Sequence, residues 1–115
     1  ERDELNVVAD QIGTPTNAAD LAKAILTILP KIKNEKVELF HFSNEGVCSW
    51  YDFAKTIFEL TDSKITLNPI DSEHYPTPAK RPYYSVLSKN KIKEDYQIEI
   101  PYWRTSLKSM IQTIQ

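Results

Sequence analysis

A proline-rich stretch at residues 76–87, PTPAKRPYYSVL, carries the side chain best suited to binding chemistry, Arg81. Each proline lacks a backbone donor and restricts the residue before it, so the stretch cannot be helical. The flanking prolines fix the backbone of Arg81 and reduce the entropy that it loses on binding. Its planar guanidinium can make paired hydrogen bonds to a phosphate group. A solvated surface loop is the alternative interpretation of the same residues.

Two further patterns are candidates for a ligand site. In DQIGTPT at residues 10–16, an expected strand meets a Gly/Pro turn and then a helix N-terminus, where free N–H groups favour anions and polar ligands. Gln11 and Thr16 are its candidate binding residues, and a plain strand-to-helix connection is the alternative. In GVCSWYDFA at residues 46–54, Trp50 could line a pocket or pack in the core at a helix start.

Other common chemistries lack the residues they need. Gly13 and Gly46 are the only glycines, so the chain has neither a Rossmann phosphate turn nor a P-loop. Cys48 is the only cysteine, which excludes an internal disulfide and is more typical of a small core residue than of a nucleophile. His41 and His74 have no neighbouring Cys/His cluster, so we expect no metal site. These residues alone assemble no catalytic constellation.

The composition limits the class of protein. The 115 residues suit one domain, and 41% hydrophobic with 26% charged residues is a globular balance. A net charge of −2 argues against a nucleic-acid binder, and no apolar run approaches the roughly 18–20 residues that span a membrane. No secretory signal is visible and a lone cysteine fits a reducing compartment, so we expect a cytoplasmic location. The sequence does not begin with Met, which is consistent with a fragment or a trimmed chain.

Strands are expected at residues 5–10, 37–43 and 65–70. The segment 37–43 carries bulky apolar residues on both faces, as in a strand covered on both sides of a parallel sheet. Pro69 favours an edge position for the third strand, because proline cannot donate a ladder hydrogen bond.

The first helix is expected to begin at Asn17, which is its predicted N-cap, with Asp20 as the reciprocal partner. Pro30 ends this helix or kinks its last turn. Its apolar face contains Ala18, Leu21, Ala22, Ile25, Ile28 and Leu29.

Three more helices follow. Ser49 is expected to cap a helix at residues 50–60, with Asp52 at the third helical position. A short helix is expected to start near Ser88, and a closing helix has Pro101 in its first turn. The residues predicted to face inward are Trp50, Phe53, Ala54, Ile57 and Phe58 in the helix at 50–60, and Trp103, Leu107, Met110, Ile111 and Ile114 in the closing helix.

The order β-α-β-α-β followed by two helices predicts an α/β fold. Three short strands are too few to cover these apolar faces, and a two-sided strand at 37–43 also needs neighbours at its edges. We therefore expect this chain to complete a larger sheet that it does not itself contain.

Three motifs, taken together and in this order, resemble one family. They are DQ-x-G-x-PT, G-x-x-SWY-x-FA and P-A-x-RP-x-x-S-x-L, within VVADQIGTPTNAADLAKAI, VELFHFSNEGVCSWYDFAKTIF and YPTPAKRPYYSVLSKNKI. With PYWRTSLKSM, they are similar to the C-terminal portion of the dTDP-4-dehydrorhamnose reductase family, which are extended short-chain dehydrogenases/reductases. The resemblance covers nearly all 115 residues.

The resemblance implies a parent activity and a division of labour. Residues 1–115 would be the C-terminal sugar-nucleotide-binding domain of an enzyme that uses NADPH or NADH to reduce the 4-keto group of dTDP-4-dehydro-L-rhamnose to dTDP-L-rhamnose. The cofactor turn and the catalytic Tyr-x-x-x-Lys pair would belong to an N-terminal Rossmann half that is absent from this chain. Tyr51 and Lys55 match that spacing but lie inside the SWYDFA motif, so we expect neither to be catalytic. We expect the chain alone to be inactive and to bind no cofactor.

The resemblance also implies site residues and partners. Arg81 would neutralise the diphosphate of a dTDP-sugar, and Gln11, Thr16 and Trp50 would also bind the substrate. The expected partners are the dTDP-sugar and the Rossmann half, with a homodimer as a further candidate. Two alternatives remain: a non-catalytic protein of the same fold, like the regulatory β subunit of methionine adenosyltransferase, and an interaction module without a ligand.

Overall fold

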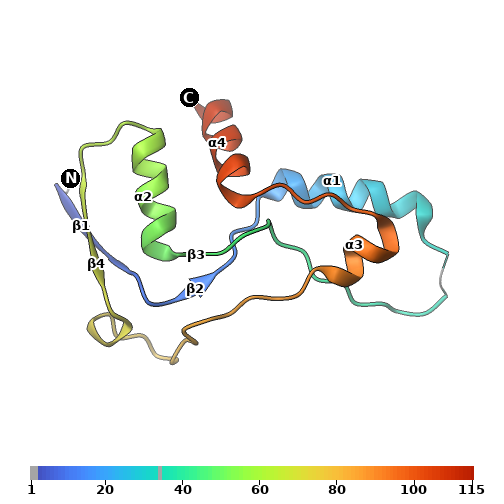
Figure 1. Ribbon diagram of the computed structural model, residues 1–115, viewed down its shortest axis with the longest axis horizontal. Coiled ribbons are helices and arrows are strands. Elements are labelled where there is room, and N and C mark those ends of the chain that lie inside the picture. Colours follow the sequence, from blue (N-terminus) through green and yellow to red (C-terminus); the bar gives the residue numbers. More distant parts are fainter. Residues whose placement is uncertain (1–2, 34) are drawn as a thin grey trace.

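The computed structural model describes residues 3–33 and 35–115, which form an elongated, flat molecule of 52 × 35 × 20 Å (Figure 1). Strands β1 and β4 lie with helix α2 at one end, helices α1 and α3 lie at the other, and α4 lies between them. In chain order the elements are β1 (Glu4–Val8), β2 (Ile12–Gly13), α1 (Ala18–Ile28), the 3-10 helix η1 (Leu29–Lys31), β3 (Cys48–Ser49), α2 (Trp50–Leu60), β4 (Thr66–Ile70), the 3-10 helix η2 (Ser72–His74), α3 (Asn90–Tyr96) and α4 (Trp103–Ile114).

A parallel strand pair confirms the predicted α/β class. β1 and β4 pair in the register Val7↔Pro69 and Val8↔Ile70, and α2, which precedes β4, packs against both strands. Both strands are edges of this two-stranded sheet, which suits the missing N–H of Pro69. Within the described part of the chain, no helix is long and apolar enough to cross a membrane.

The helix starts follow the predicted caps, with one exception. Asn17 Oδ1 accepts a hydrogen bond from the Asp20 N–H at 3.0 Å, as expected of an N-cap. The Asp20 carboxylate was expected to bond back to the backbone of Asn17, and this is wrong, because it accepts from Asn44 and Ser106 instead. At α2 the predicted capping box is complete: Ser49 Oγ accepts from the Asp52 N–H at 2.9 Å, and Asp52 accepts from the Ser49 N–H at 3.1 Å.

The main core forms where α2 meets α4. Its buried members are Cys48, Trp103, Leu107 and Ile111, with Phe53, Ile57 and Leu60 packed against them. Cys48 is therefore the core residue that the sequence indicated. Met110 and Ile114 were predicted to face inward, and this is wrong, because the buried side of α4 is turned toward Leu107 and Ile111 and leaves both exposed.

The predicted strand at 37–43 is also wrong. This segment has no strand partner among the described residues, and the next strand in the chain is β3, which pairs antiparallel with β2. Phe40 on one face packs against Tyr96 of α3 with ring centroids 5.4 Å apart, while Val37 and Leu39 are exposed. The segment is therefore covered on one face only within the described chain, so the expectation of cover on both sides is wrong as well. A strand forms only where a second strand supplies backbone partners.

The two C-terminal helices are close to their predicted positions. α3 begins at Asn90, whose N–H donates to Ser88 Oγ at 3.3 Å. α4 begins at Trp103, so the expectation that Pro101 lies in its first turn is wrong by two residues. Pro101 instead offers its carbonyl to the Glu45 N–H at 3.0 Å.

Candidate functional site

A pocket of about 510 Å³ opens between the start of α1, the start of α2 and the proline-rich stretch. It brings together all four residues predicted to bind a substrate, Gln11, Thr16, Trp50 and Arg81. The complete lining is Gln11, Ile12, Gly13, Thr14, Pro15, Thr16, Cys48, Ser49, Trp50, Phe53, Arg81, Pro82 and Ser85. Residues from all three sequence motifs therefore line the same cavity.

Strand β2 joins these motifs physically. Along one edge it pairs with β3, with Ile12 opposite Ser49. Along the other edge the Ile12 N–H donates to Tyr83 O at 2.8 Å, and the Ser85 N–H donates to Ile12 O at 2.9 Å. This second pairing anchors the chain two residues after Arg81, so the guanidinium is held beside the pocket by ordered backbone.

Arg81 is the cation of the pocket. Its side chain is exposed, and it forms no ion pair with any residue that the structure describes. Pro82, beside it, also lines the pocket, whereas Lys80 does not. As predicted, no helix forms between Tyr75 and Leu87. The charge of Arg81 is thus available to an anionic group in the cavity.

A hydrogen-bonded cluster orients Gln11 at the pocket edge. The Asp10 carboxylate accepts from Ser72 Oγ at 2.5 Å and from the Ser72 N–H at 3.0 Å. These bonds, the side-chain one first, lower the pKa of Asp10 below its usual value. Gln11 Nε2 donates to the same Ser72 Oγ at 3.0 Å, which leaves Gln11 Oε1 without a partner among the described residues. The amide oxygen can therefore accept a hydrogen bond from a ligand.

Trp50 and Thr16 complete the predicted set. Trp50 was expected to face inward, which is wrong: it is the first residue of α2, lies at the pocket and is 59% exposed. Thr16 is exposed immediately before the α1 cap. The Asn17 side chain already accepts a hydrogen bond from an N–H at the start of α1, and Asp20 places a negative charge in the first turn of that helix. The helix N-terminus beside Thr16 therefore suits neutral polar contacts better than anion binding.

Sequence reasoning missed several pocket residues. Thr14 lines the pocket, and its Oγ1 is buried with no hydrogen-bond partner among the described residues. Ser85 could have been found, because it is the serine of the motif P-A-x-RP-x-x-S.

The residues considered for catalysis are not placed for it. Burial, with a smaller contribution from Asp52, raises the pKa of Cys48 to about 11, so its thiol stays protonated and is no nucleophile near neutral pH. Tyr51 and Lys55 do not line the pocket.

The sequence analysis did not identify the buried residue Asn44. It is 1% exposed, precedes β3, and hydrogen-bonds to Asp20 of α1 and Ser106 of α4. Its Oδ1 accepts from the Asn17 N–H at 2.6 Å, and its Nδ2 donates to Asp20 Oδ2 at 2.7 Å and to Pro101 O at 3.2 Å. Its own N–H donates to Pro15 O at 3.1 Å, which fixes a pocket-lining residue from behind.

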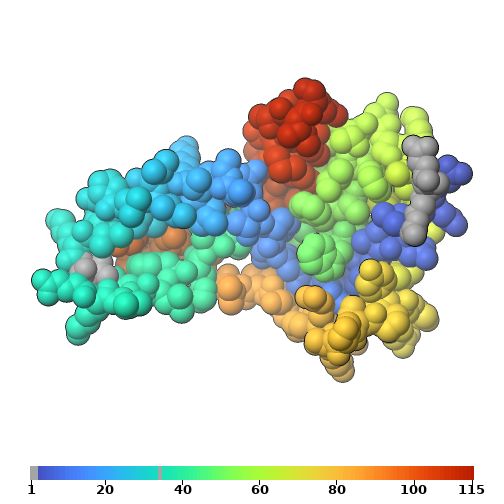
Figure 2. Space-filling model, turned by 180° about the vertical axis from the view of Figure 1, so that it is seen from behind, coloured from blue at the N-terminus to red at the C-terminus, as the bar shows by residue number. Residues whose placement is uncertain are grey.

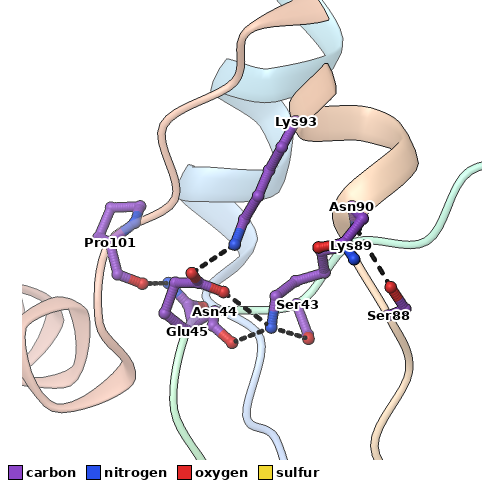
Figure 3. Close-up of polar contacts among 8 residues, drawn as sticks. All are labelled: Ser43, Asn44, Glu45, Ser88, Lys89, Asn90, Lys93 and Pro101. Carbon is purple, nitrogen blue, oxygen red and sulfur yellow. Dashed lines mark hydrogen bonds and ion pairs between the residues drawn. The ribbon is translucent and has the colours of Figure 1, made fainter. Parts of the chain in front are cut away.

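Charged residues extend this network toward α3 (Figure 3). Lys89 is only 8% exposed; its Nζ donates to Asn44 O at 3.1 Å and pairs with Glu45 at 3.0 Å. Lys93 pairs with the other oxygen of Glu45 at 2.5 Å. The hydrogen bond from Lys93, followed by that from Lys89, lowers the pKa of Glu45 although partial burial opposes this. The network supports the pocket without lining it.

One group of possible metal ligands lies outside the pocket. Asp71, which precedes η2, and Glu73 and His74 of η2 place three ligand atoms within 4.8 Å of one another, and all three side chains are exposed. Exposed acidic groups of this kind are common without a bound ion, so we assign no metal to them.

Comparison with known families identifies the fold. The model of the RmlD substrate binding domain matches residues 1–115. The chain belongs to this family. It is similar to the dTDP-4-dehydrorhamnose reductase of Sinorhizobium fredii, at 38% identity over 95% of this chain and 40% of the relative. It is also similar to the spore coat polysaccharide biosynthesis protein SpsK of Bacillus subtilis, at 39% identity over 96% of this chain and 38% of the relative.

Solved structures agree with this membership of the RmlD substrate binding family. A dTDP-4-dehydrorhamnose reductase from Clostridium acetobutylicum matches with a TM-score of 0.87 and 42% identity, over 99% of this chain and 40% of that one. The reductase of Bacillus anthracis in complex with NADP matches with a TM-score of 0.88 and 35% identity, over 100% of this chain and 39% of that one. The chain thus spans about 40% of the length of these relatives.

Proposed function

We propose that this chain is the sugar-nucleotide-binding part of an NADPH- or NADH-dependent dTDP-4-dehydrorhamnose reductase. The observation that carries the proposal is the single pocket in which Arg81, Gln11, Thr16 and Trp50 meet. Its volume of about 510 Å³ lies within the range of roughly 300–1,000 Å³ that is usual for small-molecule sites. The parent enzyme reduces the 4-keto group of dTDP-4-dehydro-L-rhamnose to give dTDP-L-rhamnose.

The pocket offers a different contact to each part of such a ligand. Arg81, unpaired within the described chain, makes bidentate hydrogen bonds to the diphosphate. The exposed face of Trp50 packs against a ring of the ligand, since an aromatic surface favours flat or apolar groups. Gln11 Oε1 and the hydroxyl of Thr16 bond to sugar hydroxyls. These groups bind and orient the substrate, and the hydride comes from the nicotinamide cofactor.

The described residues do not fit a dinucleotide-binding turn. Such a turn needs glycines whose missing side chains let the backbone approach the pyrophosphate. At Gly46 the space for a side chain is already filled by Tyr102 and Trp103, at 2.3 and 2.9 Å from an ideal Cβ. We therefore propose that the cofactor is bound by an N-terminal Rossmann half of the parent, in the cytoplasm, and that this chain alone is inactive. The B. anthracis relative with its NADP supports a dinucleotide-dependent parent.

The relatives also bear on the alternatives. Three of the four named above are reductases, and the fourth is a polysaccharide biosynthesis protein. These names support an enzyme parent over a regulatory subunit or a ligand-free module.

The test is the reaction itself, in the full-length protein that contains this chain. We expect loss of NADPH or NADH absorbance that depends on dTDP-4-dehydro-L-rhamnose. Trp50→Ala should raise KM, whereas Tyr51→Phe should leave kcat unchanged, because Tyr51 lies outside the pocket. Folded full-length protein that oxidises neither cofactor with this substrate would contradict the proposal, and loss of activity in Tyr51→Phe would overturn our exclusion of the Tyr51–Lys55 pair.

A further inference from the structure

The parallel register of β1 and β4 brings Ser72 next to the polar residues that follow β1. Val8, the last residue of β1, lies opposite Ile70, the last residue of β4, and the Ala9 N–H continues the pairing by donating to Ile70 O at 2.9 Å. Asp10 and Ser72 each lie two residues beyond these strand ends. They therefore meet at the carboxyl ends of two parallel strands, where α/β folds usually bind ligands. In Figure 2 the yellow atoms of the chain after β4 lie beside the blue atoms of the N-terminal segment.

Ser72 binds the Asp10 carboxylate through both its backbone and its side chain. The Ser72 N–H donates to the two carboxylate oxygens at 3.0 Å each, and Ser72 Oγ donates to Oδ1 at 2.5 Å. These bonds, the side-chain one first, lower the pKa of Asp10, so the group is ionised near neutral pH and can only accept. The single hydrogen of the Ser72 hydroxyl is therefore committed to Asp10.

The Ser72 oxygen is left as an acceptor, and Gln11 supplies the donor. Gln11 Nε2 donates to Ser72 Oγ at 3.0 Å. The reverse orientation of the amide would place Gln11 Oε1 against an oxygen that has no hydrogen left to offer, so two acceptors would face each other. The direction of the hydrogen bonds thus fixes which end of the amide faces Ser72. Oε1 remains the free end of this pocket-lining side chain.

Capping of η2 explains only part of this arrangement. Asp71 occupies the cap position of η2 but makes no side-chain cap hydrogen bond, and Asp10 accepts from the Ser72 N–H in its place. That role requires the backbone N–H alone, whereas the bonds through Ser72 Oγ continue to Gln11. Neither Asp10 nor Ser72 lines the pocket, so any effect on a ligand passes through Gln11.

We propose that Asp10 and Ser72 are positioning residues that fix the Gln11 amide with its oxygen available to the ligand. The identity of that ligand as a dTDP-sugar rests on the proposed function. The fixed amide makes this point of the pocket selective for a group that donates a hydrogen bond, such as a sugar hydroxyl. A keto or ether oxygen, which can only accept, is disfavoured there.

Calorimetric titration of the full-length protein with dTDP-L-rhamnose tests whether Ser72 acts through Gln11. Ser72→Ala keeps the backbone N–H that binds Asp10 and removes only the hydroxyl. It should weaken binding about 3- to 12-fold, within the range expected for one neutral hydrogen bond. In a Gln11→Ala background the same substitution should change the affinity by less than about 1.5-fold, because the amide that Ser72 positions is gone. Ser72→Thr keeps a hydroxyl and should bind within about twofold of the wild type.

Ser63→Ala is the matched control for loss of a serine hydroxyl. Ser63 Oγ accepts from the nearby Ile65 N–H at 3.3 Å and does not line the pocket, so the affinity should change by less than about twofold. Wild-type affinity in Ser72→Ala would overturn the proposal. Equal losses from Ser72→Ala in the wild-type and Gln11→Ala backgrounds would also overturn it, because they would show that Ser72 acts on the fold and not through Gln11.

NMR relaxation of the Gln11 side-chain amide nitrogen, in full-length protein without nucleotide, tests the positioning independently of the ligand. The amide should be ordered in the wild type, and its order parameter should fall below about 0.6 in Ser72→Ala. Equal mobility in the two proteins would overturn the proposal, whatever the protein binds. An ordered amide in wild-type protein that does not bind dTDP-L-rhamnose would support the positioning and contradict the proposed function, so the two failures are distinguishable.

Discussion

Replacing Gly46 with alanine should destabilise the protein strongly, although the change adds one carbon atom. Gly46 has a φ of +87°, in the region that L side chains rarely adopt. An ideal Cβ at this position lies 2.3 Å from Tyr102 Cε1 and 2.9 Å from Trp103 Cδ1. The glycine of the G-x-x-SWY motif is therefore explained by packing against the start of α4 and by backbone conformation.

The magnitude follows from these two contributions. A side chain at positive φ costs roughly 1–2 kcal/mol. Forcing a methyl group into a packed site costs about 1–3 kcal/mol more, and Trp103 belongs to the buried core, so its ring has little room to move. We expect Gly46→Ala to lower the free energy of unfolding by about 2–5 kcal/mol.

Thermal and urea unfolding of the full-length protein measure this loss. A cost of this size should lower the Tm by at least about 4 °C in a protein of 150–250 residues or slightly more. Gly13→Ala is the control: φ there is not positive, and the nearest atom to its Cβ, Ser85 O, is 3.6 Å away. We expect a change within about 1 kcal/mol for the control. Equal stabilities of the two variants would refute the reasoning from the Tyr102 and Trp103 contacts.

Three further predictions concern single side chains. Ser49→Ala should reduce the free energy of urea unfolding by about 1 kcal/mol, because it removes the oxygen that accepts from the Asp52 N–H; an unchanged midpoint would contradict this role. At about pH 8, Cys48 should react with iodoacetamide roughly 100-fold more slowly in native than in unfolded protein, because its pKa is raised from 9.0 to about 11. Mass spectrometry of the peptide that contains Cys48 measures both rates, and comparable rates would contradict a protonated core thiol. Because Lys93 and Lys89 lower the pKa of Glu45 in the folded state, its carboxylate stabilises the fold above its usual pKa of 4.5, and this contribution is lost as the pH falls through the lowered value. The Tm difference between wild type and Glu45→Gln should therefore shrink as acid is added, and a difference independent of pH would contradict the pairing.

Local signals predicted the helices well. The Asn17 and Ser49 caps, with the apolar periodicity behind them, placed the starts of α1 and α2 at the right residues. Both depend on contacts three or four positions apart, which a sequence displays directly. The pocket residues were predicted less directly, from motifs whose meeting point at β2 depends on pairing between distant segments.

Non-local contacts account for the failures. The pattern at 37–43 indicated a strand, but no other part of the described chain offers a strand beside it. Asn44 gave no signal, because an asparagine in a turn is ordinary, and its burial becomes visible only when α1, α4 and the loop at Pro101 come together. The α4 residues Met110 and Ile114 have the periodicity of a core face, yet the fold turns that helix toward Leu107 and Ile111.

The central claim is that the pocket grips a sugar nucleotide through Arg81, and calorimetric titration of the full-length protein with dTDP tests it most directly. Arg81→Ala should weaken binding roughly 10- to 150-fold, since a charge-assisted bidentate contact contributes about 1.5–3 kcal/mol. Arg81→Lys should recover part of the affinity, because it keeps the charge and loses the planar fork. Lys80→Ala is the matched control; this neighbouring cation does not line the pocket, so affinity should change less than about twofold. If Arg81→Ala binds dTDP as tightly as the wild type and the Lys80 variant, the proline-rich stretch is a surface loop and the assignment is wrong.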